Sequence, residues 1–312
     1  SNLCSEITLA TNEERTAVCC LSSVNLEYYD EWSKVPAFIP DLIRMLDNVL
    51  TYFIANAPEQ LERAKFSAMR ERSLGLGAMG FHAYLQKNNM PFESVFASSV
   101  NYEMFKYIKT LAQAETERLA VERGACPDDD TCSVRNAHLL AVAPNASSSI
   151  ICGNTSPSIE PYRANAYTQK TKSGSHLQKN KYLEKVLEKY GRNDENTWKS
   201  IVTNKGSCQH LEFLSDTEKE VFKTAVEINQ SWVIEHAAQR QEFICQSQSV
   251  NLFFPPDVNK GELHNIHMLA WAKNMKTLYY LRSEAISRAD NVSNKIKREI
   301  IFEQQDCLSC EG

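Results

Sequence analysis

The first six residues of the chain, SNLCSE, bring a thiol at Cys4 and a carboxylate at Glu6 within two positions of each other. A thiol can do redox or nucleophilic chemistry only if it is held still, and chain termini usually fray. Two interpretations follow. Either Cys4 is an incidental residue of a disordered tail, or something outside this chain fixes it in place.

The chain has ten cysteines in 312 residues, with no export signal, and we therefore expect thiols rather than disulfides. Cys307 and Cys310 form a C-x-x-C pair in DCLSCEG. Too few residues follow it for a thioredoxin-like fold, and no second ligand pair for zinc lies nearby. The pair is expected to be a dithiol on a mobile tether that exchanges with disulfides elsewhere. Five other cysteines are expected to be inert core residues: Cys126, Cys132, Cys152, Cys208 and Cys245.

The segment KTLYY places Tyr279 and Tyr280 side by side near the end of a strand-like run. Adjacent strand residues point to opposite faces, which favours one buried and one exposed tyrosine. The alternative is a redox relay, because a phenol can lose an electron and a proton together and a neighbouring phenol can receive them.

The segment APNASSSI ends a strand-like run in a cluster of small residues whose backbone N–H groups can approach an anion closely. Serine-rich segments are usually only loops, so the pattern alone is weak. It indicates a phosphate-binding turn formed by Pro144, Asn145, Ala146, Ser147, Ser148 and Ser149.

The segment GLGAMG, starting at Gly75, fits the G-x-G-x-x-G pattern of dinucleotide-binding proteins. That fold needs a strand before the glycines and an acidic residue about 20 positions later. Here the preceding AKFSAMRERS is helix-like, and no suitable acidic residue follows. We therefore expect a tight turn between elements with close packing.

The composition, 43% hydrophobic and 23% charged, is that of a globular protein with a sizeable core. A net charge of -5 gives no basic surface for a nucleic-acid polymer. We find neither an apolar run long enough to cross a bilayer nor a signal sequence, and we expect a cytoplasmic protein without a membrane partner.

Helical patterns alternate with short apolar runs, which predicts a parallel α/β architecture. Helices are expected over about 30–57, 95–123 and 214–241. Buried strands are expected over 16–26, 138–144, 243–254 and 275–281. Loose segments are expected over 168–180 and after about Asp290, where polar residues dominate.

Together these motifs resemble the large, catalytic subunit of class I ribonucleotide reductase. SNLCSEITLAT is similar to its radical-cysteine loop, VCCLSSVNL to a strand with a reducing cysteine, APNASSSI to its substrate-phosphate turn, and KTLYY to its tyrosine pair. RERSLGLGAMGFHAYL, NTSPSIEPYRANAY and the terminal C-x-x-C also resemble family segments. The motifs occur in the family's order from the first residue to the last.

The resemblance implies a role for each residue of the opening loop. Cys4 would carry a transient thiyl radical that removes the 3′-hydrogen of the ribose, Glu6 would be the general base on the 3′-hydroxyl, and Asn2 would hydrogen-bond the substrate. In an extended loop residues 2, 4 and 6 project to one side, so the three side chains are expected to share a face.

The resemblance also assigns the electron carriers. Cys19 would be one of two thiols that reduce the substrate, with its partner thiol in the first half of the barrel, whereas Cys20 points the other way along the strand and is structural. Cys307 and Cys310 would re-reduce the resulting disulfide and be regenerated by thioredoxin or glutaredoxin. Tyr279 and Tyr280 would receive the radical from a metal-bearing small subunit, so no metal is expected in this chain.

The implied fold is the second half of a ten-stranded α/β barrel, starting in the central loop that carries the radical cysteine. Residues 1–290 would form this half and residues 291–312 a mobile tail. The first half and its regulatory nucleotide sites are missing, which predicts a divided subunit, inactive until an amino-terminal piece joins it. Two alternatives remain: a glycyl-radical enzyme with a related barrel, although no glycine-radical motif is found, and an inactive scaffold that binds the small subunit or a nucleotide.

Overall fold

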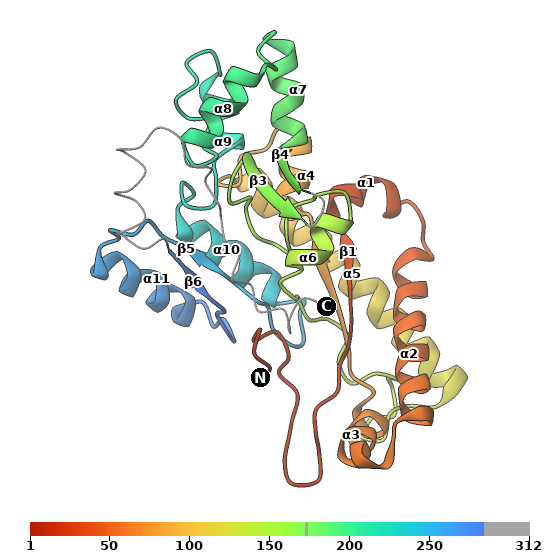
Figure 1. Ribbon diagram of the computed structural model, residues 1–312. Helices are drawn as coiled ribbons and strands as arrows, with labels where there is room; N and C mark the ends of the chain where they lie inside the picture. Colours follow the sequence, from red (N-terminus) through yellow and green to blue (C-terminus); the bar gives the residue numbers. More distant parts are fainter. Residues whose placement is uncertain (172–173, 284–312) are drawn as a thin grey trace.

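A computed structural model of the chain describes residues 1–171 and 174–283 (Figure 1). The strands are β1 (Cys20–Asn25), β2 (Leu74–Met79), β3 (Ala166–Thr171), β4 (Gly174–Lys179), β5 (Leu252–Phe253) and β6 (Leu281–Arg282). The α-helices are α1 (Tyr29–Trp32), α2 (Phe38–Asn56), α3 (Glu62–Glu71), α4 (Phe81–Lys87), α5 (Val95–Arg123), α6 (Ala146–Ile151), α7 (Lys181–Lys189), α8 (Glu195–Thr203), α9 (Asp216–Val221), α10 (Gln230–Gln241) and α11 (Lys260–Ala272).

A row of parallel segments forms the centre of the fold. β1 pairs in parallel with β2, and residues 138–142 join β2 through a parallel bridge at Leu140. Residues 246–250 join that segment through a second parallel bridge at Gln248, and the chain then continues into β5, which pairs in parallel with β6. Within the described residues, the row therefore runs from β1 at one end to β6 at the other. Parallel strands alternating with helices confirm the predicted α/β class.

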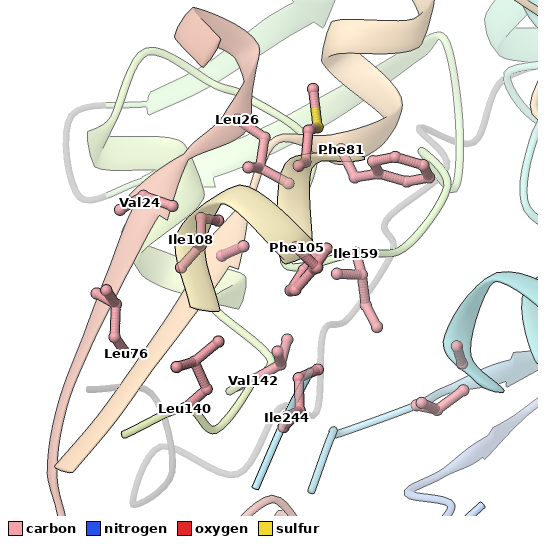
Figure 2. Close-up of a cluster of buried hydrophobic side chains, with 14 of the residues drawn as sticks. Val24, Leu26, Leu76, Phe81, Phe105, Ile108, Leu140, Val142, Ile159 and Ile244 are labelled. Carbon is pink, nitrogen blue, oxygen red and sulfur yellow. The ribbon is translucent and has the colours of Figure 1, made fainter. Parts of the chain in front are cut away.

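Helices α2, α5 and α10 cover one face of the row, and α5 packs against both of the others. Figure 2 shows the resulting core, in which Val24 of β1 and Leu76 of β2 lie with Phe105 and Ile108 of α5. All four side chains are buried.

Two of the three predicted helical segments are interrupted. The prediction over 95–123 coincides with α5, which begins after the N-cap Ser94, whose side chain accepts the N–H of Ala97, and ends at Gly124. The pattern over 30–57 is divided into α1 and α2. The pattern over 214–241 breaks into α9 and α10, because Asn229 caps a new helix start with its side chain.

Gly75 and Gly77 of GLGAMG lie inside β2 and not, as predicted, in a turn, whereas Gly80 does lie in a strand-to-helix turn. A Cβ at Gly77 would come within 2.5 Å of the carbonyl oxygen of Ala141, so glycine allows β2 to pack closely against the next segment. This strand-to-helix turn directly follows the end of β2, and the φ of +82° at Gly80 is in the left-handed region.

The segment 168–180, predicted to be loose, contributes most of an antiparallel hairpin formed by β3 and β4. Together with α7, α8 and α9 it lies at the top of the view in Figure 1, around a second, smaller apolar core that includes Tyr182, Leu183 and Trp198. The two strands consist mainly of polar residues, which explains why the sequence resembles a loop.

Cys307, Cys310 and the predicted tail 291–312 lie outside the described residues. Within residues 1–171 and 174–283, no helix has the length and apolarity needed to cross a membrane.

Candidate active site

The opening loop is a tight turn rather than the predicted extended segment. Ser5 has a φ of +67°, and its N–H donates to the carbonyl oxygen of Asn2 over 3.1 Å. Cys4 is 2% exposed and Glu6 is 3% exposed, whereas Asn2 is exposed and its side-chain oxygen accepts the N–H of Ile7. The structure thus buries the thiol and the carboxylate and uses the Asn2 side chain to close the turn. The premise of the predicted shared face, an extended backbone, is wrong.

Hydrogen bonds to residues 247–249 and 278 hold this turn in place. The Ser249 hydroxyl lies 2.6 Å from the Cys4 carbonyl oxygen and 3.1 Å from Glu6 Oε2. The Ser247 N–H donates to the Glu6 carbonyl oxygen over 2.9 Å, and Ser5 Oγ donates to the Leu278 carbonyl oxygen over 3.1 Å. Contacts from residues far along the same chain therefore help to fix Cys4 in place.

The Cys4 thiol contacts Tyr279, with Sγ 3.5 Å from the phenol oxygen. The ring of Tyr279 lies against that of Tyr280, with centroids 4.0 Å apart and an interplanar angle of 33°. The guanidinium of Arg282 lies 4.8 Å from the centre of the Tyr280 ring. Burial, and in addition the contact with Cys4, raises the pKa of the Tyr279 phenol, which keeps it protonated near neutral pH. A thiol and two phenols thus form a contiguous series.

The two rings lie together because the backbone is not a regular strand at this point. β6 begins only at Leu281, and the Tyr280 N–H donates to the side chain of Asn251 rather than to a neighbouring backbone carbonyl. The Tyr279 N–H donates to the Val250 carbonyl oxygen over 2.8 Å. The alternation that would send adjacent side chains to opposite faces does not apply here.

Cys19 and Cys20, just before and at the start of β1, have different surroundings. Cys20 packs against the main core, as the prediction of a structural role requires. Cys19 Sγ instead accepts a hydrogen bond from Gln246 Nε2 over 3.2 Å, and burial raises the pKa of its thiol to about 12. Gly75 makes room for this sulfur, since a Cβ there would lie 2.8 Å from it.

Gln246 also links Cys19 to the opening loop. Its Oε1 accepts the N–H of Thr8 over 3.3 Å, and its Nε2 also donates to the Leu74 carbonyl oxygen over 2.9 Å. The same buried amide therefore contacts the Cys19 sulfur, β2 and the segment that follows Glu6.

The predicted phosphate turn leads into a short helix. Pro144 follows the parallel segment 138–142, Asn145 takes a left-handed conformation with a φ of +50°, and α6 starts at Ala146. Ser23 of β1 donates to the Asn145 side chain over 3.1 Å. Ser149 is buried, and its hydroxyl donates to the Ala146 carbonyl oxygen. The proton of this hydroxyl is therefore engaged within the turn itself.

The turn and the thiol lie toward the same end of the parallel row. Pro144 comes two residues after Val142, and Val142 pairs with Gln248, directly before the Ser249 that holds Cys4. Ligands of parallel α/β proteins bind outside the carboxyl ends of the strands. The phosphate turn, the thiol and the carboxylate thus come from segments that converge at this edge.

The cysteines predicted to be core residues divide into two groups. Cys126 and Cys208 are buried and Cys245 is partly buried, but Cys132 and Cys152 are exposed, so for these two the prediction is wrong. Both lie in loops at helix or turn ends, where no core exists to cover them. Within the described residues, no three His, Cys, Asp or Glu side chains are grouped so as to hold a metal ion.

Sequence reasoning missed Gln246, Ser247, Ser249 and Asn251, although all four are buried beside the predicted site. A usable signal was present: the strand-like segment FICQSQSVNLFF contains a run of polar residues that a buried strand accepts only when each has a partner.

Comparison with known proteins identifies the family. The family model described as "Ribonucleotide reductase, barrel domain" matches residues 1–131 and 130–281. The chain therefore belongs to the ribonucleotide reductase barrel-domain family, and the fold that the sequence resemblance implied is confirmed. Within this family it is similar to the carboxy-terminal part of class I large subunits.

Three relatives support this placement. The chain is 52% identical over 295 residues to the ribonucleoside-diphosphate reductase large subunit of Invertebrate iridescent virus 6, covering 93% of this chain and 31% of the relative. It is 47% identical to that of Invertebrate iridescent virus 3, covering 100% of this chain and 50% of the relative. The solved Actinobacillus ureae class Id ribonucleotide reductase alpha subunit matches with a TM-score of 0.85 and 41% identity, covering 91% of this chain and 53% of that one. The chain thus spans about half or less of the length of these relatives.

Proposed function

We propose that the chain is the carboxy-terminal part of the catalytic subunit of a class I ribonucleotide reductase, which reduces ribonucleoside diphosphates to deoxyribonucleoside diphosphates in the cytoplasm. The observation that carries the proposal is the contact series from Tyr280 through Tyr279 to Cys4. A hydrogen-atom equivalent can pass along it, because each donor and acceptor already touch. The relatives are ribonucleoside-diphosphate reductases by name, which favours diphosphate substrates.

In the proposed reaction the Cys4 thiyl radical removes the 3′-hydrogen of the ribose and Glu6 accepts the 3′-hydroxyl proton. The 2′-hydroxyl leaves as water, and two thiols supply two electrons and two hydrogens as they form a disulfide. Glu6 then returns the proton to the 3′-oxygen and Cys4 returns the hydrogen atom to the 3′-carbon, which regenerates the thiyl radical. Cys19 is one of the two thiols that form the disulfide. The burial that raises its pKa to about 12 keeps its hydrogen on the sulfur until it is needed.

The segment from Pro144 to Ser149 would bind the substrate phosphates. The first turn of a helix leaves N–H groups without partners inside the helix, and α6 begins at the edge where Cys4 and Glu6 lie. The bond from Ser23 to Asn145 fixes this turn to β1 and so to the strand that follows Cys19. Asn2, exposed at the same loop, would contact the substrate sugar.

Further parts must come from elsewhere. An amino-terminal half would pair with the β1 end of the row and supply the second reducing thiol, and a metal-bearing small subunit would deliver the radical to Tyr280, which is 38% exposed. Cys307 and Cys310 would carry electrons from thioredoxin or glutaredoxin. The proposed site is complete only when these parts are present.

The test is a reductase assay of the reconstituted halves with the small subunit, comparing wild type with Cys4→Ser. We expect deoxynucleotide from wild type only. Cys4→Ser at wild-type rate would refute the proposal, and a wild-type complex that binds the small subunit without turnover would favour the scaffold alternative. The family match does not favour a glycyl-radical enzyme.

A further inference from the structure

Ser249 lies between the two groups of the opening loop that are proposed to act on the ribose. Its side chain is fully buried, with 0% exposed surface. Its hydroxyl oxygen is 2.6 Å from the Cys4 carbonyl oxygen and 3.1 Å from Glu6 Oε2. We infer that Ser249 is a positioning residue that holds the Cys4 thiol and the Glu6 carboxylate in one arrangement, an inference that rests on the function proposed above.

The Ser249 hydroxyl has a single proton for two neighbouring acceptors. A serine hydroxyl carries one proton and can accept two hydrogen bonds. While Glu6 is ionised, that one proton serves either the Cys4 carbonyl or the carboxylate. The hydroxyl oxygen thus lies within hydrogen-bond distance of the Cys4 backbone and the Glu6 side chain at once, and ties the position of one to that of the other.

The support behind Ser249 is itself fixed. Its N–H donates to the Val142 carbonyl oxygen over 2.9 Å, within the parallel row. The next residue, Val250, accepts the N–H of Tyr279. One short stretch of strand thus aligns the Cys4 turn and the phenol that contacts its sulfur, which is the rigid backing that a reactive group needs.

Removing the hydroxyl should loosen the turn without releasing it. The contacts that remain in Ser249→Ala include those from Ser247 N–H to the Glu6 carbonyl oxygen and from Ser5 Oγ to the Leu278 carbonyl oxygen. A misplacement of about 1 Å in a reacting group costs about 100-fold in rate. We therefore expect a loss in kcat of about 10-fold to 100-fold, with a much smaller change in KM.

The experiment uses the reconstituted catalytic subunit with its small subunit and compares wild type, Ser249→Ala and the control Ser67→Ala. Ser67 is also buried and its hydroxyl lies 3.5 Å from a carboxylate oxygen of Glu71, in α3 and remote from the site. We measure kcat and KM, the isotope effect on kcat with a 3′-deuterated ribonucleoside diphosphate, and amide hydrogen exchange at Ser5 and Ile7.

Ser249→Ala should show a lower kcat, a larger isotope effect because hydrogen removal becomes limiting, and faster exchange at both amides, while Ser67→Ala matches wild type. Unchanged kcat, isotope effect and exchange in Ser249→Ala would overturn the inference. A change in KM with an unchanged kcat would overturn it as well. Absence of deoxynucleotide from wild type would refute the proposed function instead, and hydrogen exchange would still show whether Ser249 holds the turn.

Discussion

The rings of Tyr279 and Tyr280 lie 4.0 Å apart between centroids, although the two residues are adjacent in an extended segment. In a regular strand they would point to opposite faces. Here the side chain of Asn251 accepts the Tyr280 N–H in place of a backbone carbonyl, and β6 begins only at Leu281. Two phenols in contact that end at the Cys4 sulfur support the proposed radical route, whereas one buried and one exposed tyrosine would be ordinary packing.

Replacing Tyr279 with phenylalanine should abolish the reductase activity of the reconstituted complex. The ring and its packing remain, but the O–H that lies 3.5 Å from Cys4 Sγ is lost and no hydrogen-atom equivalent can pass. The free energy of unfolding should change by only about 1 kcal/mol, the usual value of one hydrogen bond. Tyr84→Phe, which removes the bond from a remote phenol to Asp30, is the control and should keep full activity. Substantial activity in Tyr279→Phe would exclude the radical route.

Local patterns were sufficient to predict some elements. Helix α5 was predicted over its full length, since its apolar spacing is bounded by the capping Ser94 and by Gly124. β2 was not, because glycine is rare in strands and the close approach of Ala141 that requires Gly77 is a tertiary contact. The β3–β4 hairpin was missed because its strands consist mainly of polar residues, which are also typical of loops.

The candidate site shows the same division. The family resemblance implied radical and redox roles for Cys4, Glu6 and Cys19, but the surroundings of these residues come from far along the chain. Ser249 lies 245 residues from Cys4, and Gln246 lies 227 residues from Cys19. No local pattern encodes such pairs. The turn at Ser5 could not be derived either, because the same residues are compatible with an extended backbone.

The Cys19 thiol should react with alkylating agents only at high pH. Burial raises its pKa to about 12, so at pH 8 only about one thiol in ten thousand is the reactive thiolate. Its alkylation rate should rise about tenfold per pH unit from pH 8 to 11. Gln246→Leu should slow it further, because the hydrogen bond from Gln246 lowers this pKa. Mass spectrometry of modified peptides measures both rates, with exposed Cys132 as the reference. Equal rates for the two cysteines at pH 8 would contradict the prediction.

Gly80→Ala should destabilise the fold strongly. A φ of +82° costs an L-residue about 1–2 kcal/mol, and the new Cβ would also lie 2.8 Å from Thr155 Oγ1 and closer still to Asn25 Oδ1. Gly153→Ala is a matched control, because Gly153 has a φ of +84° with no atom within 4 Å of the added Cβ. In denaturant unfolding, Gly80→Ala should lose about 1–3 kcal/mol more than Gly153→Ala. Equal losses would mean that the strand-to-helix turn has room for a side chain.

Protonation of His82 should contribute to acid unfolding. Burial lowers the pKa of this histidine to about 3, and its Nδ1 accepts the Tyr162 N–H over 2.9 Å, so a second ring proton would face another N–H. Because the folded pKa lies below the unfolded value of about 6.5, this stability is complete above pH 6.5 and is lost as the pH falls toward 3, by up to about 5 kcal/mol. His82→Gln should be less stable at pH 7 but lose less free energy of unfolding between pH 6.5 and 4, measured by urea unfolding. The exposed His264→Gln should keep the wild-type pH dependence, and the same pH dependence in His82→Gln would assign acid unfolding to other groups.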